Sequence, residues 1–279
     1  MLSSKSFAPA NISCIFGIKA DSNPRKAGSV GVGFCIDKGV IARVMGGKKT
    51  SIRFNKNIID FPTVNTVIEI LTNKTAMVDI ESSLPLGCGF GLSGASALAA
   101  AYALNKLFNL KKSKLDLAIA AHTAEVINGT GLGDVINQYY GGFCVKLETS
   151  ANFIVKKLPI AGRNVYCRHF SPLETKSIIQ NKDIRDAIND AADNALSKIK
   201  ELIKNPKTIG DFPLIIKISK QFAVDSNLLK DNDAMDIINK IEKNNGNASM
   251  IMLGNAVFSD TKFEGSAEFR ISNKGAFVY

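Results

Sequence analysis

The chain has 279 residues, 46% of them hydrophobic, and a formal net charge of +10. This length and composition allow a substantial buried core, which excludes a disordered or fibrous chain. The apolar runs are too short to span a membrane, and the N-terminus lacks the apolar stretch of a secretory signal, so we expect a cytoplasmic protein without a membrane partner. The lysines are spread along the chain with no basic block, so nucleic acid is not an expected partner.

The pattern of the first 150 residues predicts mixed α and β structure. Residues up to about 60 alternate short β-type runs with glycine turns, which indicates an antiparallel sheet. A helix is expected over Val64–Leu71 and a strand over Thr75–Glu81. The elements predicted next are helices at Leu92–Phe108, Ser113–Ile127 and Asp134–Tyr139, and a strand at Phe143–Leu147.

A change in composition near residue 150 indicates a domain boundary, which divides the chain into 1–150 and 151–279. Helical patterns dominate from Asp183 to Lys243. The strands expected in this half are Phe153–Leu158, Asn164–Phe170, Ser249–Leu253, Glu268–Ile271 and Ala276–Tyr279.

The segment Pro85–Leu98, PLGCGFGLSGASAL, has the features of a phosphate-binding loop. Glycines at 87, 89, 91 and 94 let backbone N–H groups approach an anion, and a helix from Leu92 points its unpaired amides at the same anion. Ser93 can cap this helix or reach a phosphate-bound Mg²⁺. The segment is equally compatible with a tight strand-to-helix turn, and it is neither a Walker A motif nor a complete Rossmann fingerprint.

A second glycine-rich segment, Asn128–Gly142, follows a helix that carries His122 and Glu125 on one face. Its glycines permit a tight loop that brings Asp134 back toward that face. Taken singly, each residue has a structural explanation: a solvated carboxylate, a helix cap, or a hydrogen-bonded core histidine. Together with the phosphate loop they predict two carboxylates in one pocket, one for a metal ion and one for a hydroxyl proton.

Three motifs occur in the order found in the GHMP kinases, and the chain resembles that family over nearly its whole length. The motifs are Phe7–Ile18, Pro85–Leu98 and Asn247–Ser259. Within the family, the pattern G-F-G-x-S-G-A and the segments Ala27–Val40 and Ala121–Gly142 are most similar to the pantoate kinases of archaea. The resemblance implies an α+β fold of two domains, an N-terminal ribosomal-S5-like α/β domain and a C-terminal ferredoxin-like domain.

The implied activity is ATP-dependent phosphorylation of the 4-hydroxyl of pantoate, a step in coenzyme A biosynthesis. Two alternatives stay open: another acceptor of the family (mevalonate, homoserine or shikimate), or an inactive regulatory protein that binds a nucleotide or associates with nucleic acid. Retention of Ser93, Glu125 and Asp134 together argues against the inactive protein. The sequence is also compatible with a homodimer.

The resemblance implies a role for each matching residue. Asp134 would orient or deprotonate the substrate hydroxyl, and Ser93 and Glu125 would bind Mg²⁺. The ATP phosphates would lie against Pro85, Gly87, Gly89, Phe90, Gly91, Leu92, Ser93, Gly94 and Ala95. We expect Ser29, His122 and Lys146 to contact pantoate, although Lys146 could instead be a solvated lysine on an edge strand.

Overall fold

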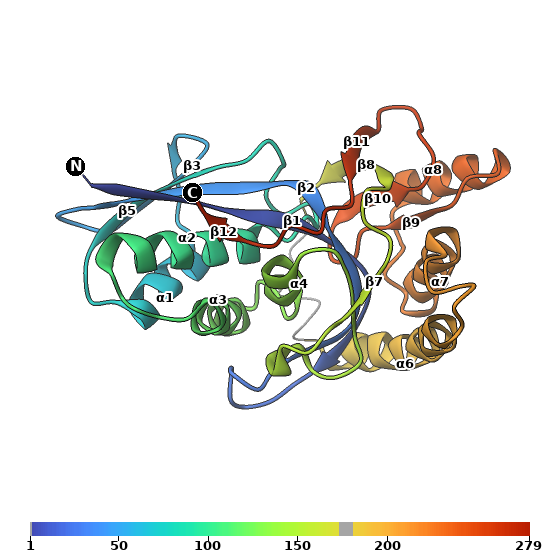
Figure 1. The fold of residues 1–279 in the computed structure, drawn as a ribbon. Helices are drawn as coiled ribbons and strands as arrows, with labels where there is room; N and C mark the ends of the chain where they lie inside the picture. Colours follow the sequence, from blue (N-terminus) through green and yellow to red (C-terminus); the bar gives the residue numbers. More distant parts are fainter. Residues whose placement is uncertain (1, 173–180) are drawn as a thin grey trace.

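The computed structural model describes residues 2–172 and 181–279, and its mixed α and β architecture agrees with the predicted class (Figure 1). The first sheet has eight strands within the described residues, in the order β12-β1-β2-β5-β3-β4, with β6 and β7 added alongside β2. These strands are β1 (Ser3–Lys19), β2 (Gly28–Gly46), β3 (Ser51–Phe54), β4 (Asn57–Ile58), β5 (Ala76–Glu81), β6 (Phe143–Lys146), β7 (Lys156–Leu158) and β12 (Phe277–Val278).

Strands β1 and β2 form a long antiparallel hairpin whose register runs from Ser3 opposite Met45 to Lys19 opposite Gly28. The short β-type runs predicted in this region are parts of these two continuous strands. The middle of β1 is buried on both faces, so the alternation of polar and apolar residues that marks a half-exposed strand is absent there. The sequence pattern therefore underestimated the length of both strands.

Four helices lie on one face of the first sheet: α1 (Pro62–Leu71), α2 (Leu92–Phe108), α3 (Lys114–Asn128) and α4 (Asp134–Tyr140) (Figure 1). Helix α2 contacts β1 and β2 on one side and α1, α3 and α4 on the others, and most of its residues are buried. Its alanine-rich sequence suits this central place, because small side chains let surrounding elements approach closely. Helix α3 begins at Lys114, one residue after the predicted start, because Ser113 is its N-cap and forms a capping box with Asp116.

The second sheet is antiparallel, in the order β11-β8-β10-β9, and helices α6, α7 and α8 accompany it. Helix α6 packs on α7 and on β1, and the main apolar core includes residues from both halves of the chain. The bounds are β8 (Asn164–Ser171), α6 (Lys182–Lys204), α7 (Phe212–Asp225), α8 (Asn232–Lys243), β9 (Ala248–Met250), β10 (Asn255–Ser259) and β11 (Ala267–Arg270).

The predictions for the second half need one correction and one addition. The strand expected at Phe153–Leu158 is confined to Lys156–Leu158, because Ser150–Asn152 forms a short 3-10 helix (η1) and Phe153 follows it with φ 52°. Strand β10 was not predicted. Strands β7 and β12 pair in the first sheet although they follow residue 150, and the boundary at that residue stays a prediction.

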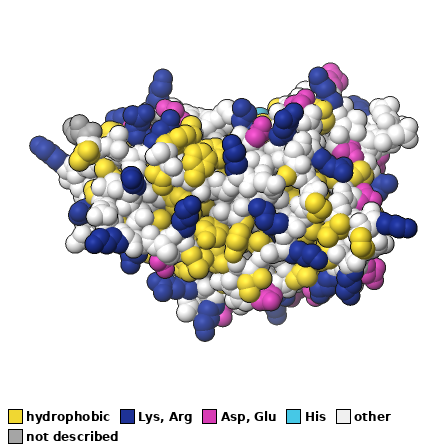
Figure 2. All heavy atoms as spheres, viewed as in Figure 1, with side chains coloured by type: hydrophobic (Ala, Val, Ile, Leu, Met, Phe, Trp, Pro, Cys, Tyr) yellow, Lys and Arg dark blue, Asp and Glu magenta, His cyan; other side chains and the backbone are white. Residues whose placement is uncertain are grey.

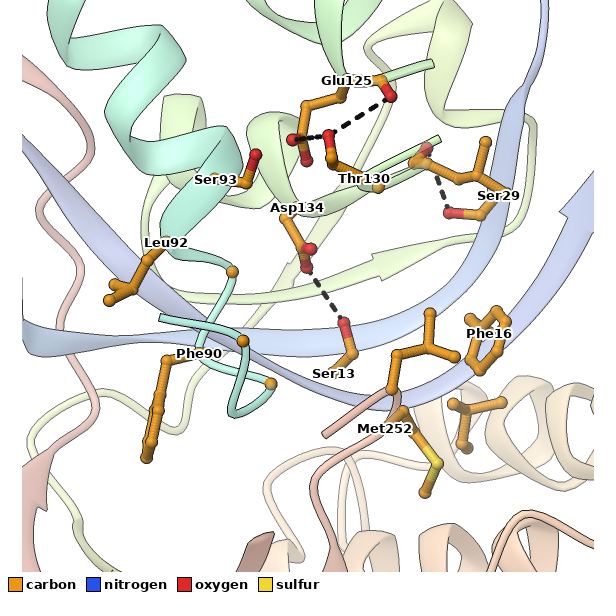
Figure 3. Close-up of a pocket in the computed structure, with 18 of the residues that line it drawn as sticks. Ser13, Phe16, Ser29, Phe90, Leu92, Ser93, Glu125, Thr130, Asp134 and Met252 are labelled. Carbon is orange, nitrogen blue, oxygen red and sulfur yellow. Dashed lines mark hydrogen bonds between the residues drawn. The ribbon is translucent and has the colours of Figure 1, made fainter. Parts of the chain in front are cut away.

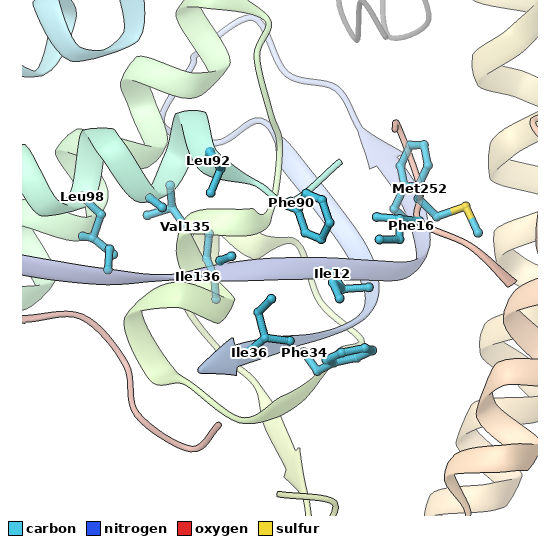
Figure 4. Close-up of a cluster of buried hydrophobic side chains, with 14 of the residues drawn as sticks. Ile12, Phe16, Phe34, Ile36, Phe90, Leu92, Leu98, Val135, Ile136 and Met252 are labelled. Atoms are coloured by element: carbon cyan, nitrogen blue, oxygen red, sulfur yellow. The ribbon is translucent and has the colours of Figure 1, made fainter. Parts of the chain in front are cut away.

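A cluster of buried apolar side chains joins the phosphate-loop region to the hairpin (Figure 4). It includes Ile12 of β1, Ile36 of β2, Leu92 of α2 and Ile136 of α4, all essentially inaccessible to solvent. Burying a side chain of this size contributes about 1.5–3 kcal/mol. The start of α2 is therefore held rigidly against β1 and α4.

The surface agrees with the scattered lysines of the sequence. Figure 2 shows Lys and Arg side chains distributed over the visible face, with no single basic patch on it. Among the described residues, no helix combines the length and apolar character that crossing a bilayer requires.

Candidate active site

A pocket opens where the N-terminus of α2 faces β1, the loop before α4, and the loop between β9 and β10 (Figure 3). All three sequence motifs contribute to it, through Ser13, the phosphate loop and Met252. Segments more than 200 residues apart in the chain therefore meet at one place.

The phosphate loop has the backbone that an anion site requires. Gly87, Gly89 and Gly91 have φ values of +78°, +83° and +61°, which favour glycine. Gly91 precedes the first turn of α2, where no side chain caps the helix and no acidic residue occurs. The first amides of α2 are thus left for a ligand, and the positive end of the helix dipole favours an anion there.

Neighbouring elements hold this loop in place. The amide of Asn11 in β1 donates to the Phe90 carbonyl at 3.0 Å, and the side-chain amide of Gln138 donates to the Gly91 carbonyl at 2.7 Å. A Cβ atom on Gly89 would fall 2.9 Å from Cα of Gly254, so the glycine of the third motif packs directly on the loop. Gly89 and Gly254 must both be glycine because the backbone of the loop touches the backbone of the third motif at these residues.

Glu125 and Asp134 converge above Gly131. A Cβ atom on Gly131 would lie 2.1 Å from Oε2 of Glu125 and 3.6 Å from Oδ2 of Asp134. The structure therefore brings the carboxylate of Glu125 in α3 and that of Asp134 in the second glycine-rich segment into one pocket, and Ser93 lines the same pocket from the first turn of α2.

The Glu125 carboxylate is only half satisfied within the protein. It is 1% exposed; the Thr130 hydroxyl donates to Oε1 at 2.6 Å, whereas Oε2 is buried without a hydrogen-bond partner. Burial raises the pKa of Glu125 to about 7, the Thr130 hydrogen bond lowers it, and Asp134 raises it further. An unpaired buried oxygen of this kind is costly unless a cation or donor from a ligand reaches it.

Asp134 is the first residue of α4, and two residues of the first motif orient it. Asn11 donates from Nδ2 to Oδ1 at 2.6 Å, and Ser13 donates to the same oxygen at 3.2 Å. Burial raises the pKa of the Asp134 carboxyl, while Lys146 and the two hydrogen bonds oppose that rise. Oδ2 is left facing the pocket region above Gly131.

Lys146 and Ser29 meet at Gly133, next to Asp134. A Cβ atom on Gly133 would lie 2.2 Å from Oγ of Ser29 and 2.9 Å from Nζ of Lys146. Lys146 is 4% exposed and donates to the Gly133 carbonyl at 3.0 Å and to Oδ1 of Asn137 at 3.3 Å, so it is not a solvated edge-strand lysine. Burial lowers the pKa of its amine, and Asp134 opposes that effect.

His122 lies apart from these residues and does not line the pocket. Its Nε2 is 3.0 Å from the Ala27 carbonyl and its ring packs edge-on against Phe153. Burial lowers the pKa of His122 to about 4, so the imidazole is neutral at pH 7. Pro85, Gly94 and Ala95 also lie outside the pocket lining; Gly94 instead faces Oε2 of Glu125, 3.0 Å from where its Cβ would be.

Sequence reasoning missed several polar residues that shape the site. Asn11 and Ser13 hold Asp134, Gln138 holds Gly91, and Thr63 and Thr130 lie between Ser93 and Glu125. Asn11 and Ser13 are inside the first motif and could have been found there. Thr63 had no local signal, because its contacts are made across 30 or more residues of sequence.

Within the described residues, no three His, Cys, Asp or Glu side chains gather as a metal site. A divalent cation here would therefore depend on one carboxylate, one hydroxyl and oxygens supplied by a ligand. This donor set is typical of Mg²⁺ sites that are completed by phosphates.

Comparison with known proteins agrees with this geometry. The profile of the GHMP kinases N terminal domain matches residues 62–142. The chain is 35% identical to the pantoate kinase of Methanocaldococcus jannaschii, over 92% of this chain and 93% of the relative. It is 27% identical to the pantoate kinase of Methanospirillum hungatei JF-1, over 91% of this chain and 86% of that relative.

A solved structure described as a phosphotransferase related to the CoA biosynthesis pathway has the same fold. Its TM-score is 0.84 and its sequence is 25% identical, covering 100% of this chain and 99% of that one. The relatives extend over both halves of the chain, so the similarity is not limited to the phosphate loop. The chain therefore belongs to the GHMP kinase family.

Proposed function

We propose that this protein transfers the γ-phosphoryl group of ATP to the 4-hydroxyl of pantoate. The observation that carries the proposal is the position of Asp134, whose oriented carboxylate lies beside the uncapped N-terminus of α2 and beside Lys146. A phosphate site, a proton acceptor (Asp134) and a cationic side chain for the carboxylate of the substrate (Lys146) are then adjacent. The nearly full-length similarity to pantoate kinases supports pantoate over mevalonate, homoserine or shikimate.

The chain's own groups have distinct tasks in this reaction. The amides of the phosphate loop and of the first turn of α2 bind the ATP phosphates. Asp134 accepts the proton of the attacking hydroxyl, which a base within hydrogen-bond reach can do as the new bond forms. Asn11 and Ser13 hold its carboxylate in the orientation this requires.

Ser93 and Glu125 would hold Mg²⁺, and the residues fit that ion. Oε2 of Glu125 is buried without a partner, and the Ser93 hydroxyl lines the same pocket. When bound, the ion supplies positive charge that neutralises the β- and γ-phosphate oxygens. ATP and water would supply the other oxygen ligands of the ion.

Lys146 and Ser29 are the proposed contacts for the carboxylate of pantoate. Both reach the pocket at Gly133, immediately before Asp134. His122 was grouped with them from the sequence, but its neutral ring and its contact with Ala27 support a structural role under this subsite.

The function is tested by ATP-dependent ADP release with pantoate, mevalonate, homoserine, shikimate and pantothenate. We expect turnover with pantoate, and little with pantothenate because its amide replaces the carboxylate. Coupling between phosphorus and the C4 protons in the product spectrum should show phosphorylation at the 4-hydroxyl. Turnover with another acceptor but not with pantoate, or phosphorylation at the 2-hydroxyl, would contradict the proposal.

Lys146→Met tests the carboxylate contact, since it removes the charge but keeps a long side chain. Losing one charge-assisted hydrogen bond costs about 1.5–3 kcal/mol, which corresponds to a roughly 10–100-fold higher KM for pantoate. ATP affinity should stay unchanged. Lys38→Met, at an exposed lysine of β2, is the matched control. If ATP affinity falls instead, Lys146 serves the nucleotide side of the site.

A further inference from the structure

A chain of hydroxyl groups connects the two proposed cation ligands. Oγ of Ser93 donates to Oγ1 of Thr63 at 3.1 Å, Oγ1 of Thr63 lies 3.0 Å from Oγ1 of Thr130, and Thr130 donates to Oε1 of Glu125 at 2.6 Å. Three elements supply these residues: α1, the start of α2, and the end of α3 with its following loop. Thr63 is fully buried and lies outside the three GHMP motifs.

When Glu125 is ionised, as a cation ligand must be, the number of protons determines the direction of this chain. Each hydroxyl carries one proton, and an ionised carboxylate can only accept. The Thr130 hydroxyl donates its hydrogen bond to Glu125, so Thr63 must donate to Thr130 and is left to accept from Ser93. All the O–H bonds therefore point from Ser93 toward Glu125.

This direction has a consequence for both ligands. With its proton directed to Thr63, Ser93 presents the lone pairs of Oγ to the pocket that it lines. Thr130 occupies Oε1 of Glu125, which leaves Oε2 unpaired. A cation requires lone pairs from both residues and a position free of protons.

Without Thr63, the Ser93 hydroxyl has another acceptor close by. Ser93 and Glu125 line the same pocket, and Oε2 of Glu125 lies 3.0 Å from where a Cβ atom of Gly94, the residue after Ser93, would be. A serine proton turned toward the carboxylate would pair the two ligands with each other and occupy the place of the cation. The buried hydroxyl of Thr63 offers an acceptor that draws the proton away.

We propose that Thr63 is a positioning residue, which sets the direction of the Ser93 hydroxyl so that Ser93 and Glu125 can bind a divalent cation together. The inference rests on the proposed function only in requiring a Mg²⁺–nucleotide complex. It does not depend on pantoate being the acceptor.

The test is the effect of Mg²⁺ on ADP affinity, measured by calorimetry for wild type, Thr63→Val and Thr63→Ser. Valine keeps the shape of threonine but has no hydroxyl, whereas serine keeps the hydroxyl. In Thr63→Val, we expect the ADP affinity measured without Mg²⁺ to be unchanged. The increase in ADP affinity that Mg²⁺ causes should be smaller by about 10-fold or more, as for other residues that orient metal ligands. Thr63→Ser should retain the gain, and turnover should follow the same order.

Thr123→Val is the matched control, because Thr123 is also buried near Glu125 but donates only to the Ile119 carbonyl of its own helix. It should behave as wild type, and circular dichroism establishes that each variant is folded. A normal Mg²⁺ gain in Thr63→Val overturns the proposal, and so does an equal loss of ADP affinity with and without Mg²⁺. Absence of the gain in wild type would reject the cation site itself, whereas the acceptor assays test pantoate separately.

Discussion

Asp134→Asn is expected to bind ATP normally and to lose about 10²–10⁴-fold in kcat, the usual contribution of a positioned general base. The amide oxygen of asparagine can still accept from Asn11 and Ser13, so the loop before α4 should keep its shape. It cannot accept the proton of the substrate hydroxyl. Single-turnover measurements at saturating ATP and pantoate report the chemical step directly.

The control for this variant is Asp233→Asn, which removes an exposed carboxylate from the first turn of α8. It should leave kcat, KM and ATP affinity as in wild type. If Asp134→Asn retains full turnover, Asp134 has no part in proton transfer. If it loses ATP affinity as well as turnover, its main role is electrostatic balance in the pocket.

Glu125→Gln is expected to lower turnover by about 100-fold or more, because Lewis-acid stabilisation of phosphoryl transfer is worth several kcal/mol. Ligands that bind the native state stabilise it against unfolding. The extra stabilisation that Mg²⁺ adds to that of ADP should therefore largely disappear in this variant. Thermal unfolding with ADP alone and with ADP plus Mg²⁺ measures the difference. Glu69→Gln, at an exposed position of α1, is the control.

The same substitution should stabilise the protein in the absence of Mg²⁺ at high pH. The pKa of Glu125 is about 7 in the folded protein and 4.5 as its ordinary value, so the folded state holds this proton more tightly than the unfolded state. The free energy of unfolding therefore falls as pH rises from 4.5 through about 7. The shift in pKa corresponds to a loss of roughly 3 kcal/mol in the free energy of unfolding at high pH. Glutamine does not ionise, so the variant does not lose this stability.

Urea unfolding at pH 5 and pH 8 tests this expectation. The two proteins should have similar stability at pH 5, and Glu125→Gln should be the more stable at pH 8 without Mg²⁺. If the difference in unfolding free energy between wild type and Glu125→Gln is the same at pH 5 and pH 8, the prediction fails. Glu125 would then be ionised in the folded protein at little cost, with its unpaired oxygen solvated.

Local signals in the sequence pointed to several residues that the structure brings together. The glycines before Leu92 predicted an anion site at the start of α2, and the structure shows no side-chain cap on those amides. The spacing of Glu125 and Asp134 around a glycine loop predicted two carboxylates in one pocket, and they meet above Gly131. Such features could be predicted because turns and caps depend on neighbouring residues.

Other features depend on packing between distant segments. The length of β1 was hidden because both of its faces are covered, and Phe153 ends a 3-10 turn where its apolar neighbours predicted a strand. His122 shares a helix face with Glu125, yet its ring is directed to Ala27 and Phe153. Helical spacing gives the direction of a side chain but not which element lies there.

The sequence by itself determined the family, and it predicted the phosphate loop and the three residues proposed for chemistry, because short motifs and local turns encode them. Only the tertiary structure decided what surrounds those residues. It showed that Asn11 and Ser13 orient Asp134, that Lys146 is buried beside it, and that Thr63 accepts a hydrogen bond from Ser93. These contacts join residues 13 to 123 positions apart, and side-chain packing across such separations leaves no periodic or local pattern in the chain.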